Sequence, residues 1–73
     1  MALPRFRIFK DRAGQYRWTL IAGNGEPVAT SEGYVYHSGA RYSAYRVKAI
    51  ASSANIDDEV ERLALLLKAM LRK

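Results

Sequence analysis

Cysteine is absent from this sequence of 73 residues, and histidine occurs once, as His37. The lack of cysteine excludes disulfides and thiolate metal sites, and a lone histidine cannot hold a metal ion without help from carboxylates. A chain of this length forms one domain, and the small core of such a domain is only marginally stable. Close packing or association with another subunit must therefore supply the remaining stability.

Long apolar runs are also lacking. The longest, Leu63 to Leu67, is far shorter than the roughly 20 residues that cross a membrane. The start of the chain, Met1 to Arg7, does not have the apolar segment of a secretory signal. We therefore expect no membrane association and a cytoplasmic location.

Basic residues are unevenly distributed along the chain. The net charge is +5, and residues 57–73 are neutral because they carry four basic and four acidic side chains. The whole excess lies in residues 1–56, where eight basic side chains face three acidic ones. This distribution suits an anionic partner, and solubility is the alternative explanation.

Alternating aromatic and β-branched residues predict three short strands, at residues 5–10, 16–22 and 28–31. Residues 11–14 read as the first turn, and Asn24-Gly25 between two apolar runs is a strong hairpin signal. Pro27 fits the beginning of the third strand. The sequence therefore predicts a three-stranded antiparallel meander.

Side-chain alternation assigns the two faces of this sheet. The first face is apolar throughout and should be the core, with Phe6, Ile8, Tyr16, Trp18, Leu20, Ala22 and Val28. The second face is basic with some apolar content, and it holds Arg5, Arg7, Phe9, Arg17, Thr19, Ile21 and Ser31.

A helix is expected from about Gly39 to Ser52, with Ser38 as its cap. Its apolar stripe is made of small side chains, Ala40, Ala44, Val47 and Ala51. Small residues let a helix approach a sheet closely, so that a large residue such as Trp18 fills the space. The opposite side carries two tyrosines among basic residues, namely Tyr42 and Tyr45 with Arg41, Arg46 and Lys48.

A second helix is expected to begin after Asp57 or Asp58 and to run to about Leu71. Its acidic residues lie in the first turns and its basic residues mostly at the end, as the helix dipole prefers. Its apolar stripe is formed by Val60, Leu63, Ala64, Leu67, Met70 and Leu71, widened by Leu66. Three surfaces could receive this stripe: the Tyr42/Tyr45/Ala49 side of the first helix, the same helix of a dimer mate, or a foreign partner. We favour a surface within the homodimer, and we expect the second helix to cover Tyr42 and Tyr45.

Residues 6–34 also follow a recognisable pattern, which reads Phe6-x-Ile8-Phe9-Lys10-Asp11-x-x-Gly14-x-Tyr16-Arg17-Trp18-x-Leu20-x-Ala22-x-Asn24-Gly25-Glu26-x-Val28-Ala29-x-Ser31-Glu32-Gly33-Tyr34. The pattern resembles the YegP-like family of small uncharacterised bacterial and archaeal proteins. The likeness continues through the first helix to about Asn55 and covers roughly two thirds of the chain.

The resemblance implies a β-β-β-α-β unit that pairs with a second copy, either in tandem or as a second subunit, into one sheet with exchanged last strands. A single copy is present here, so a homodimer is implied. It implies no activity and no catalytic residue. Only Ala54 to Asp57 could supply an exchanged strand, and the added helix follows. We therefore divide the chain into a YegP-like unit, residues 1–56, and an amphipathic helix, residues 57–73, packed on the same domain or its dimer mate.

Catalytic and cofactor chemistry find no support in the residue pattern. His37 lacks the nucleophile and the orienting carboxylate that a general base requires. The acidic residues at 57–61 do not have the spacing of a calcium loop, and they suit helix capping better. Residues 23–25 are not a phosphate loop, because no Gly-Lys-Ser/Thr follows. We therefore expect no enzyme, no metal site and no cofactor.

Two surfaces remain as candidates for binding a partner. The basic sheet face offers Arg5, Arg7 and Arg17, and the outer side of the first helix offers Arg41, Tyr42, Tyr45 and Arg46. The favoured function is a non-catalytic interaction module, a homodimer that binds a protein partner. The alternative is a weak, non-specific nucleic-acid-binding protein that uses the basic sheet face.

Overall fold

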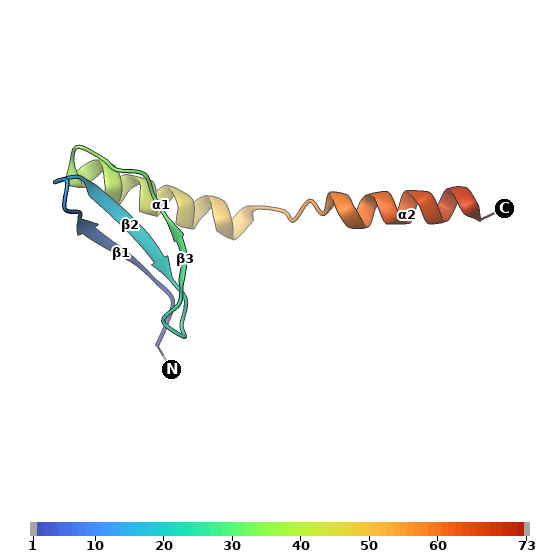
Figure 1. Cartoon of the computed structure of the whole chain (residues 1–73), viewed down its shortest axis with the longest axis horizontal. Helices are drawn as coiled ribbons and strands as arrows, with labels where there is room; N and C mark the ends of the chain where they lie inside the picture. The colour runs from blue at the N-terminus through green and yellow to red at the C-terminus, as the bar shows by residue number, and fades with distance from the viewer. Residues whose placement is uncertain (1, 73) are drawn as a thin grey trace.

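Three antiparallel strands form a meander in the order β1-β2-β3, and two helices follow along the chain (Figure 1). The computed structural model describes residues 2–72. Its elements are β1 (Arg5–Lys10), β2 (Tyr16–Ile21), β3 (Pro27–Thr30), α1 (His37–Ser53) and α2 (Glu59–Leu71). The α+β architecture predicted from the sequence is confirmed.

Two glycines make the tight turns between the strands. Gly14 has φ +82° and its N–H donates to the Asp11 carbonyl, 3.1 Å away. Gly25 has φ +89° and its N–H donates to the Ala22 carbonyl, 2.9 Å away. Residues with a Cβ are strained in this left-handed region, so glycine sets both reversals.

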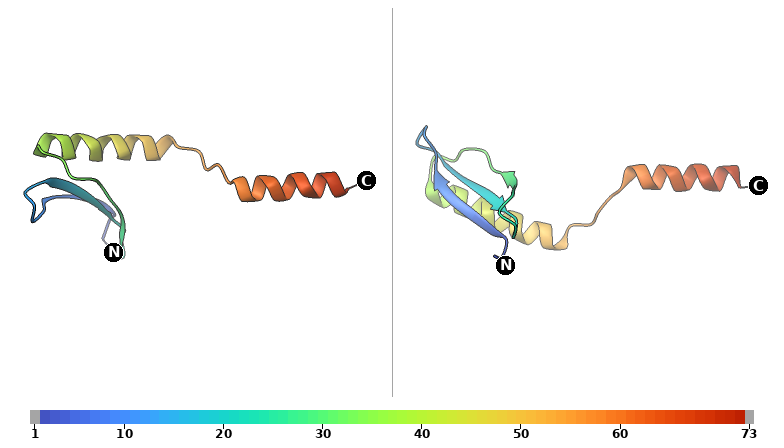
Figure 2. Two further views of the ribbon diagram at one scale, coloured as in Figure 1. Left: turned by 45° about the horizontal axis from the view of Figure 1, so that its top comes forward. Right: turned by 60° about the horizontal axis from the view of Figure 1, so that its bottom comes forward.

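The register of β1 and β2 confirms the predicted faces for these strands. Phe6 lies opposite Leu20 and Ile8 lies opposite Trp18, so these apolar side chains share one face. Arg7 lies opposite Thr19 on the other face. Because α1 lies over one face only, the second face is open (Figure 2).

The prediction of which β3 side chains lie on each face of the sheet is wrong by one residue. The register is irregular beside Leu20 and Ile21, so that Leu20 pairs with Ala29 and Thr19 pairs with Thr30. An extra residue in one strand shifts its alternation relative to the neighbouring strand. Ala29 rather than Val28 therefore shares the α1-facing side, and Thr30 rather than Ser31 lies on the outer side. Val28 is 63% exposed.

The core lies where α1 crosses β2. Trp18, Ala40 and Ala44 are its buried apolar residues among residues 2–72. The indole N–H of Trp18 donates to the Ser43 hydroxyl at 3.0 Å, and the Phe6 ring meets the Trp18 ring edge-on with centroids 5.1 Å apart. The two alanines allow the close approach of helix and sheet that the sequence predicted.

The ends of α1 differ from the prediction. Tyr36, not Ser38, is the N-cap, because the Tyr36 carbonyl accepts from Gly39 N–H at 3.0 Å. Ser38 lies inside the first turn, where its hydroxyl cannot cap the helix. At the other end, Ala51 was placed on the core stripe but is exposed, because α1 runs beyond the sheet (Figure 1).

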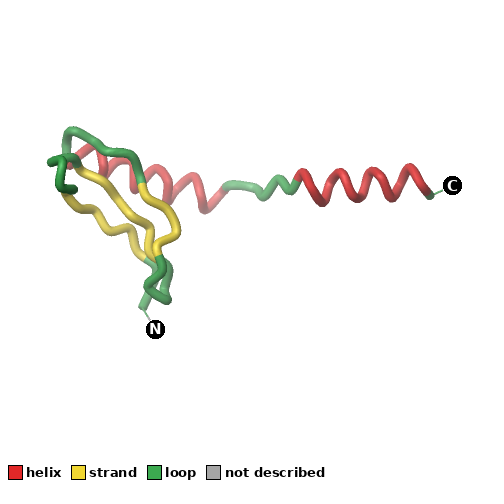
Figure 3. The backbone as a smooth tube through the Cα atoms, in the orientation of Figure 1, coloured by secondary structure: helices red, strands yellow, loops and turns green. Residues whose placement is uncertain are grey.

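The C-terminal helix extends away from the rest of the chain. No strand or helix of residues 2–72 packs against α2, and residues 54–58 connect it to α1 without regular structure (Figure 3). The radius of gyration is 18.4 Å, whereas a compact chain of this length has about 11 Å. Residues 54–58 form no fourth strand within the chain. Within residues 2–72, neither helix has the length and apolar character needed to cross a bilayer.

The buried position of Trp18 leads to a stability prediction. We expect Trp18→Ala to lower the free energy of unfolding by about 3–5 kcal/mol, because a buried tryptophan leaves a large cavity when truncated. Urea denaturation followed by circular dichroism measures the change. Tyr42→Ala is the matched control, because Tyr42 is 64% exposed, and it should change stability by less than about 1 kcal/mol. Equal effects of the two substitutions would contradict the proposed core.

Candidate functional site

An apolar groove runs between the sheet and the β1-facing flank of α1, with a volume of about 330 Å³. We call it the β1 groove; it is lined by Phe6, Ile8 and Leu20 from the sheet, by Arg41, Ala44, Tyr45 and Lys48 from α1, and by Pro4 and Arg5 at the start of β1. The three sheet residues were expected to be core, but they are only half-buried. A single helix leaves this part of the apolar face uncovered.

Basic side chains border the β1 groove on its α1 side. Arg41 and Lys48 are both exposed, and neither makes an ion pair within residues 2–72. The Arg41 guanidinium lies 5.7 Å from the centre of the Tyr45 ring, one helical turn further along α1. An apolar floor with a basic rim suits an amphipathic ligand that carries acidic residues.

A second groove lies along the opposite flank of α1, with a volume of about 360 Å³. We call it the Tyr34 groove; it is lined by Tyr34, Gly39, Tyr42, Ser43, Arg46, Val47 and Ile50. The Arg46 guanidinium lies 5.9 Å from the centre of the Tyr42 ring. The four α1 residues predicted as one binding surface are therefore divided: Arg41 and Tyr45 belong to one flank, and Tyr42 and Arg46 to the other.

The sequence predicted that α2 covers the Tyr42/Tyr45 side of α1, but α2 of the same chain does not pack there. Tyr42 and Tyr45 are 64% and 58% exposed, because α2 lies elsewhere. Both tyrosines contact arginines instead, at a spacing of four residues along the helix, which places each pair on one face.

The outer sheet face brings Arg5, Arg7 and Arg17 to one side, as predicted, but not as three free charges. The Arg7 guanidinium lies 4.6 Å from the centre of the Phe9 ring and is exposed. Arg17 instead donates to the Asp11 carboxylate at 2.7 Å and to the Ser31 carbonyl at 3.0 Å. It ties the first turn to the end of β3, so its role is structural.

The Asp11 carboxyl has a pKa lowered by its neighbours. The hydrogen bond from Arg17 lowers the pKa of Asp11 below its usual range, and the Gln15 N–H, 2.9 Å from Oδ1, lowers it further. Desolvation opposes these effects. The charged carboxylate stabilises the first turn through these hydrogen bonds, and it is poorly suited to accept a proton near neutral pH.

His37 stands apart from the groups that could make it catalytic. It is exposed in the first turn of α1, and its ring meets the Tyr16 ring edge-on with centroids 5.7 Å apart. Within residues 2–72, no three histidine or acidic side chains gather closely enough to hold a metal ion. The Tyr16 contact gives His37 a packing role at the start of α1.

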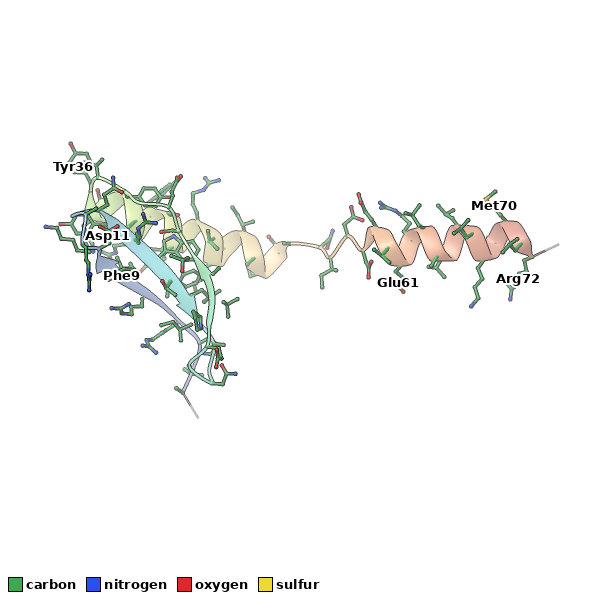
Figure 4. All side chains as sticks on the ribbon, in the orientation of Figure 1. Phe9, Asp11, Tyr36, Glu61, Met70 and Arg72 are labelled. Carbon is green, nitrogen blue, oxygen red and sulfur yellow. The ribbon has the colours of Figure 1, made fainter. Side chains whose placement is uncertain are left out.

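The acidic residues at the start of α2 act locally, as predicted. The Asp58 carboxylate accepts from Glu61 N–H at 2.9 Å, and Asp57 pairs with Arg62 at 2.9 Å. Glu59 lies 3.8 Å from Arg62, and Glu61 makes no ion pair within residues 2–72. In Figure 4, Glu61 and Met70 point from opposite sides of α2 into open space.

Every apolar side chain of α2 is exposed, so the stripe predicted from the sequence has no partner within residues 2–72. Leu65 is also apolar, although it lies about 160° around the helix from Leu67. These two leucines are 61% and 60% exposed. A helix with so much apolar surface is normally covered by another surface.

The β1 groove itself is the feature that the sequence did not reveal. Pro4 and Lys48 line it, yet neither belongs to a predicted site. The small side chains of the α1 stripe were the one indication of it in the sequence. Ala40 and Ala44 are too small to cover the face of three strands.

Comparisons with known proteins agree with the fold. Residues 11–58 match the family model described as a domain of unknown function, DUF1508. A UPF0339 protein of Agrobacterium fabrum is 35% identical over 54 residues, which cover 74% of this chain and 87% of that protein. A UPF0339 protein of Stutzerimonas stutzeri is 37% identical over 59 residues, but these cover 81% of this chain and only 50% of that protein.

A solved structure shares the fold. The solution structure of a protein from Haloferax volcanii is 34% identical and superposes with a TM-score of 0.67, covering 80% of this chain and 98% of that one. The Haloferax protein thus has almost no length left for a counterpart of the remaining fifth of this chain. The family model also ends at residue 58, immediately before α2.

The Arg17–Asp11 ion pair leads to a prediction about pH. We expect the Asp11 carboxyl to titrate below the value of a free aspartate, about 3.9. Stability from this pair is fully present above that value and is lost as the pH falls through the lower folded-state pKa. An NMR titration of the carboxyl carbon measures the midpoint. Arg17→Gln should raise it and Arg12→Gln should not; a normal midpoint in the unaltered protein would contradict the geometry.

Proposed function

Because this chain belongs to the DUF1508 family, the YegP-like family of small bacterial and archaeal proteins, we propose that it is a non-catalytic interaction module that acts as a homodimer and binds a further protein. The observation that carries the proposal is the uncovered apolar surface of α2. Each large apolar side chain gains about 1.5–3 kcal/mol when it is fully buried, so water is an unfavourable environment for this helix.

Helix stability supports the same conclusion. With 13 residues, α2 is near the lower limit at which an isolated helix is stable in water, even for favourable sequences. Packing against another surface is the usual source of the missing stability. A contiguous exposed apolar patch of this kind is typical of an association site, and otherwise promotes aggregation.

A second copy of the chain is the association partner that several observations support. The core is small and incomplete, since Phe6, Ile8 and Leu20 are only half-buried. The Stutzerimonas relative is about twice the length of the matched segment, which leaves room for a second unit in one chain. In a chain with one unit, a second subunit would take the place of that second unit.

Strand exchange is compatible with the geometry after α1. The backbone is extended at Ala54 (φ −72°, ψ 135°) and near extended at Asp58 (φ −91°, ψ 92°). Within the chain β1 is an edge strand, with β2 on one side only. An unpaired edge is a template for another strand, so we include pairing of residues 54–57 with a partner's sheet in the proposal.

The further protein would bind at the Tyr34 groove. Tyr42 and Arg46 lie there in contact with each other, and tyrosine and arginine are the residue types that contribute most to protein interfaces. The non-catalytic part of the proposal is supported by the contacts of two candidate groups: the Asp11 carboxylate accepts a hydrogen bond from Arg17, and the His37 ring meets the Tyr16 ring.

Association through α2 leads to a prediction with a matched control. We expect the full chain to sediment as a dimer at micromolar concentration. Leu67→Ala should raise the dimer Kd by about tenfold or more, because it removes buried apolar surface from the stripe. Leu65→Ala is the control: the leucine is equally exposed and the helix propensity changes equally, but the side chain lies off the stripe. A monomeric unaltered protein, or equal effects of both substitutions, would contradict the proposal.

Nucleic-acid binding is the second candidate, because the outer sheet face exposes Arg5 and Arg7 beside the Phe9 ring. If this face binds, phosphate neutralisation supplies most of the affinity. We expect Arg5→Gln/Arg7→Gln to abolish weak, strongly salt-dependent binding to a generic single strand, measured by fluorescence anisotropy. Arg12→Gln/Arg46→Gln removes the same charge elsewhere and should act less. Sequence-selective binding that persists at high salt would exclude this explanation.

A further inference from the structure

We propose that the β1 groove of each copy receives α2 of the other copy, so that the two chains exchange their C-terminal helices. The inference rests on the proposed homodimer and names the surface that α2 occupies. It joins the two apolar surfaces that the single chain leaves uncovered. Such an arrangement is symmetric, since each subunit gives one helix and receives one.

Shape is the first argument for this pairing. The α1 side of the groove extends from Arg41 to Lys48, about two helical turns, and α2 is about 20 Å long. Ala44 keeps the wall low in the middle of the groove, where a larger residue would obstruct it. A helix lying alongside α1 would place leucines of its stripe over the exposed parts of Phe6, Ile8 and Leu20.

Charge complementarity is the second argument. The groove rim is basic through Arg41 and Lys48, which make no ion pair within residues 2–72. The acidic residues of α2 lie in its first turn, where Glu59 and Glu61 are found, whereas Lys68 lies in its last turn. Glu61 lies on the side of α2 opposite Met70, and Glu59 lies 3.8 Å from Arg62. Glu59, about 100° around the helix from Val60, borders the stripe, so the first turn of α2 is the part that can meet the basic rim.

The connection between the helices favours exchange over docking on the same chain. Residues 54–58 contain no glycine and no proline, the residues that most favour a tight reversal, and both ends of this segment have non-helical, open backbone angles. The segment spans at most about 17 Å, and in Figure 1 it directs α2 away from the sheet of its own chain.

Reciprocal charge reversal in the full chain tests the proposal. One variant carries Glu59→Lys/Glu61→Lys on α2, and the other carries Arg41→Glu/Lys48→Glu in the groove. In a homodimer of either variant, both helix–groove contacts bring like charges together. In a mixed dimer, one contact has both charges reversed and the other has neither, so both are complementary again.

We expect each variant alone to dimerise less tightly, and an equal mixture of the two variants to recover the affinity of the unaltered dimer. At low salt, each variant alone should show a dimer Kd raised by about fivefold or more, and an equal mixture should return to within about twofold of the unaltered protein. Sedimentation equilibrium measures all three. Lys10→Glu/Arg12→Glu reverses the same number of charges beside the first turn, and should leave the dimer Kd unchanged within about twofold.

If the substitutions in α2 weakened dimerisation only by disrupting that helix, mixing would not restore the affinity, because α2 of the first variant keeps its substitutions in the mixed dimer. If mixing restores nothing but all four substitutions in one chain do, α2 docks on its own chain and the exchange is wrong. If the unaltered protein is a dimer that depends on Leu67 but not on these charges, the β1 groove is wrong and the proposed function stands. If the unaltered protein is a monomer, the proposed function fails as well.

Discussion

The contact between Trp18 and α1 is the interaction on which the fold depends, and its narrowness explains what the rest of the molecule leaves exposed. Ala40 and Ala44 bring α1 close to β2, and Ser43 satisfies the indole N–H. Such small side chains give close approach but little lateral cover. One helix therefore buries the middle of the sheet face and leaves an apolar groove along each flank of α1.

The same constraint connects the sheet to α2. Half-buried Phe6, Ile8 and Leu20 gain stability from any surface that covers them, and the stripe of α2 gains in the same way. The family model matches residues 11–58, and α2 begins at Glu59. In the proposed homodimer, the apolar stripe of α2 and the incomplete core of the sheet cover each other across the two copies.

The sequence predicted the elements well because their signals are local. Glycine at the two turns, alternation in β1 and β2, and the heptad-like spacing of α2 all act within a few neighbouring residues. Three features depended on distant residues and were missed. The irregular register beside Leu20 shifted the side-chain alternation of β3. Arg17 forms an ion pair with Asp11 across the first turn. The sheet is wider than α1, so the predicted α1 surface is divided between two grooves.

In the proposed homodimer, the stability of the fold and the association of the two copies are linked. A ligand that binds only the folded state stabilises it by mass action, and a second copy acts as such a ligand when it covers the β1 groove. The isolated unit keeps the Trp18 contact and its hydrogen bonds, which suffice to define the fold. In the proposed homodimer, the apolar surfaces outside that contact add stability on association, so folding of each copy and assembly favour one another.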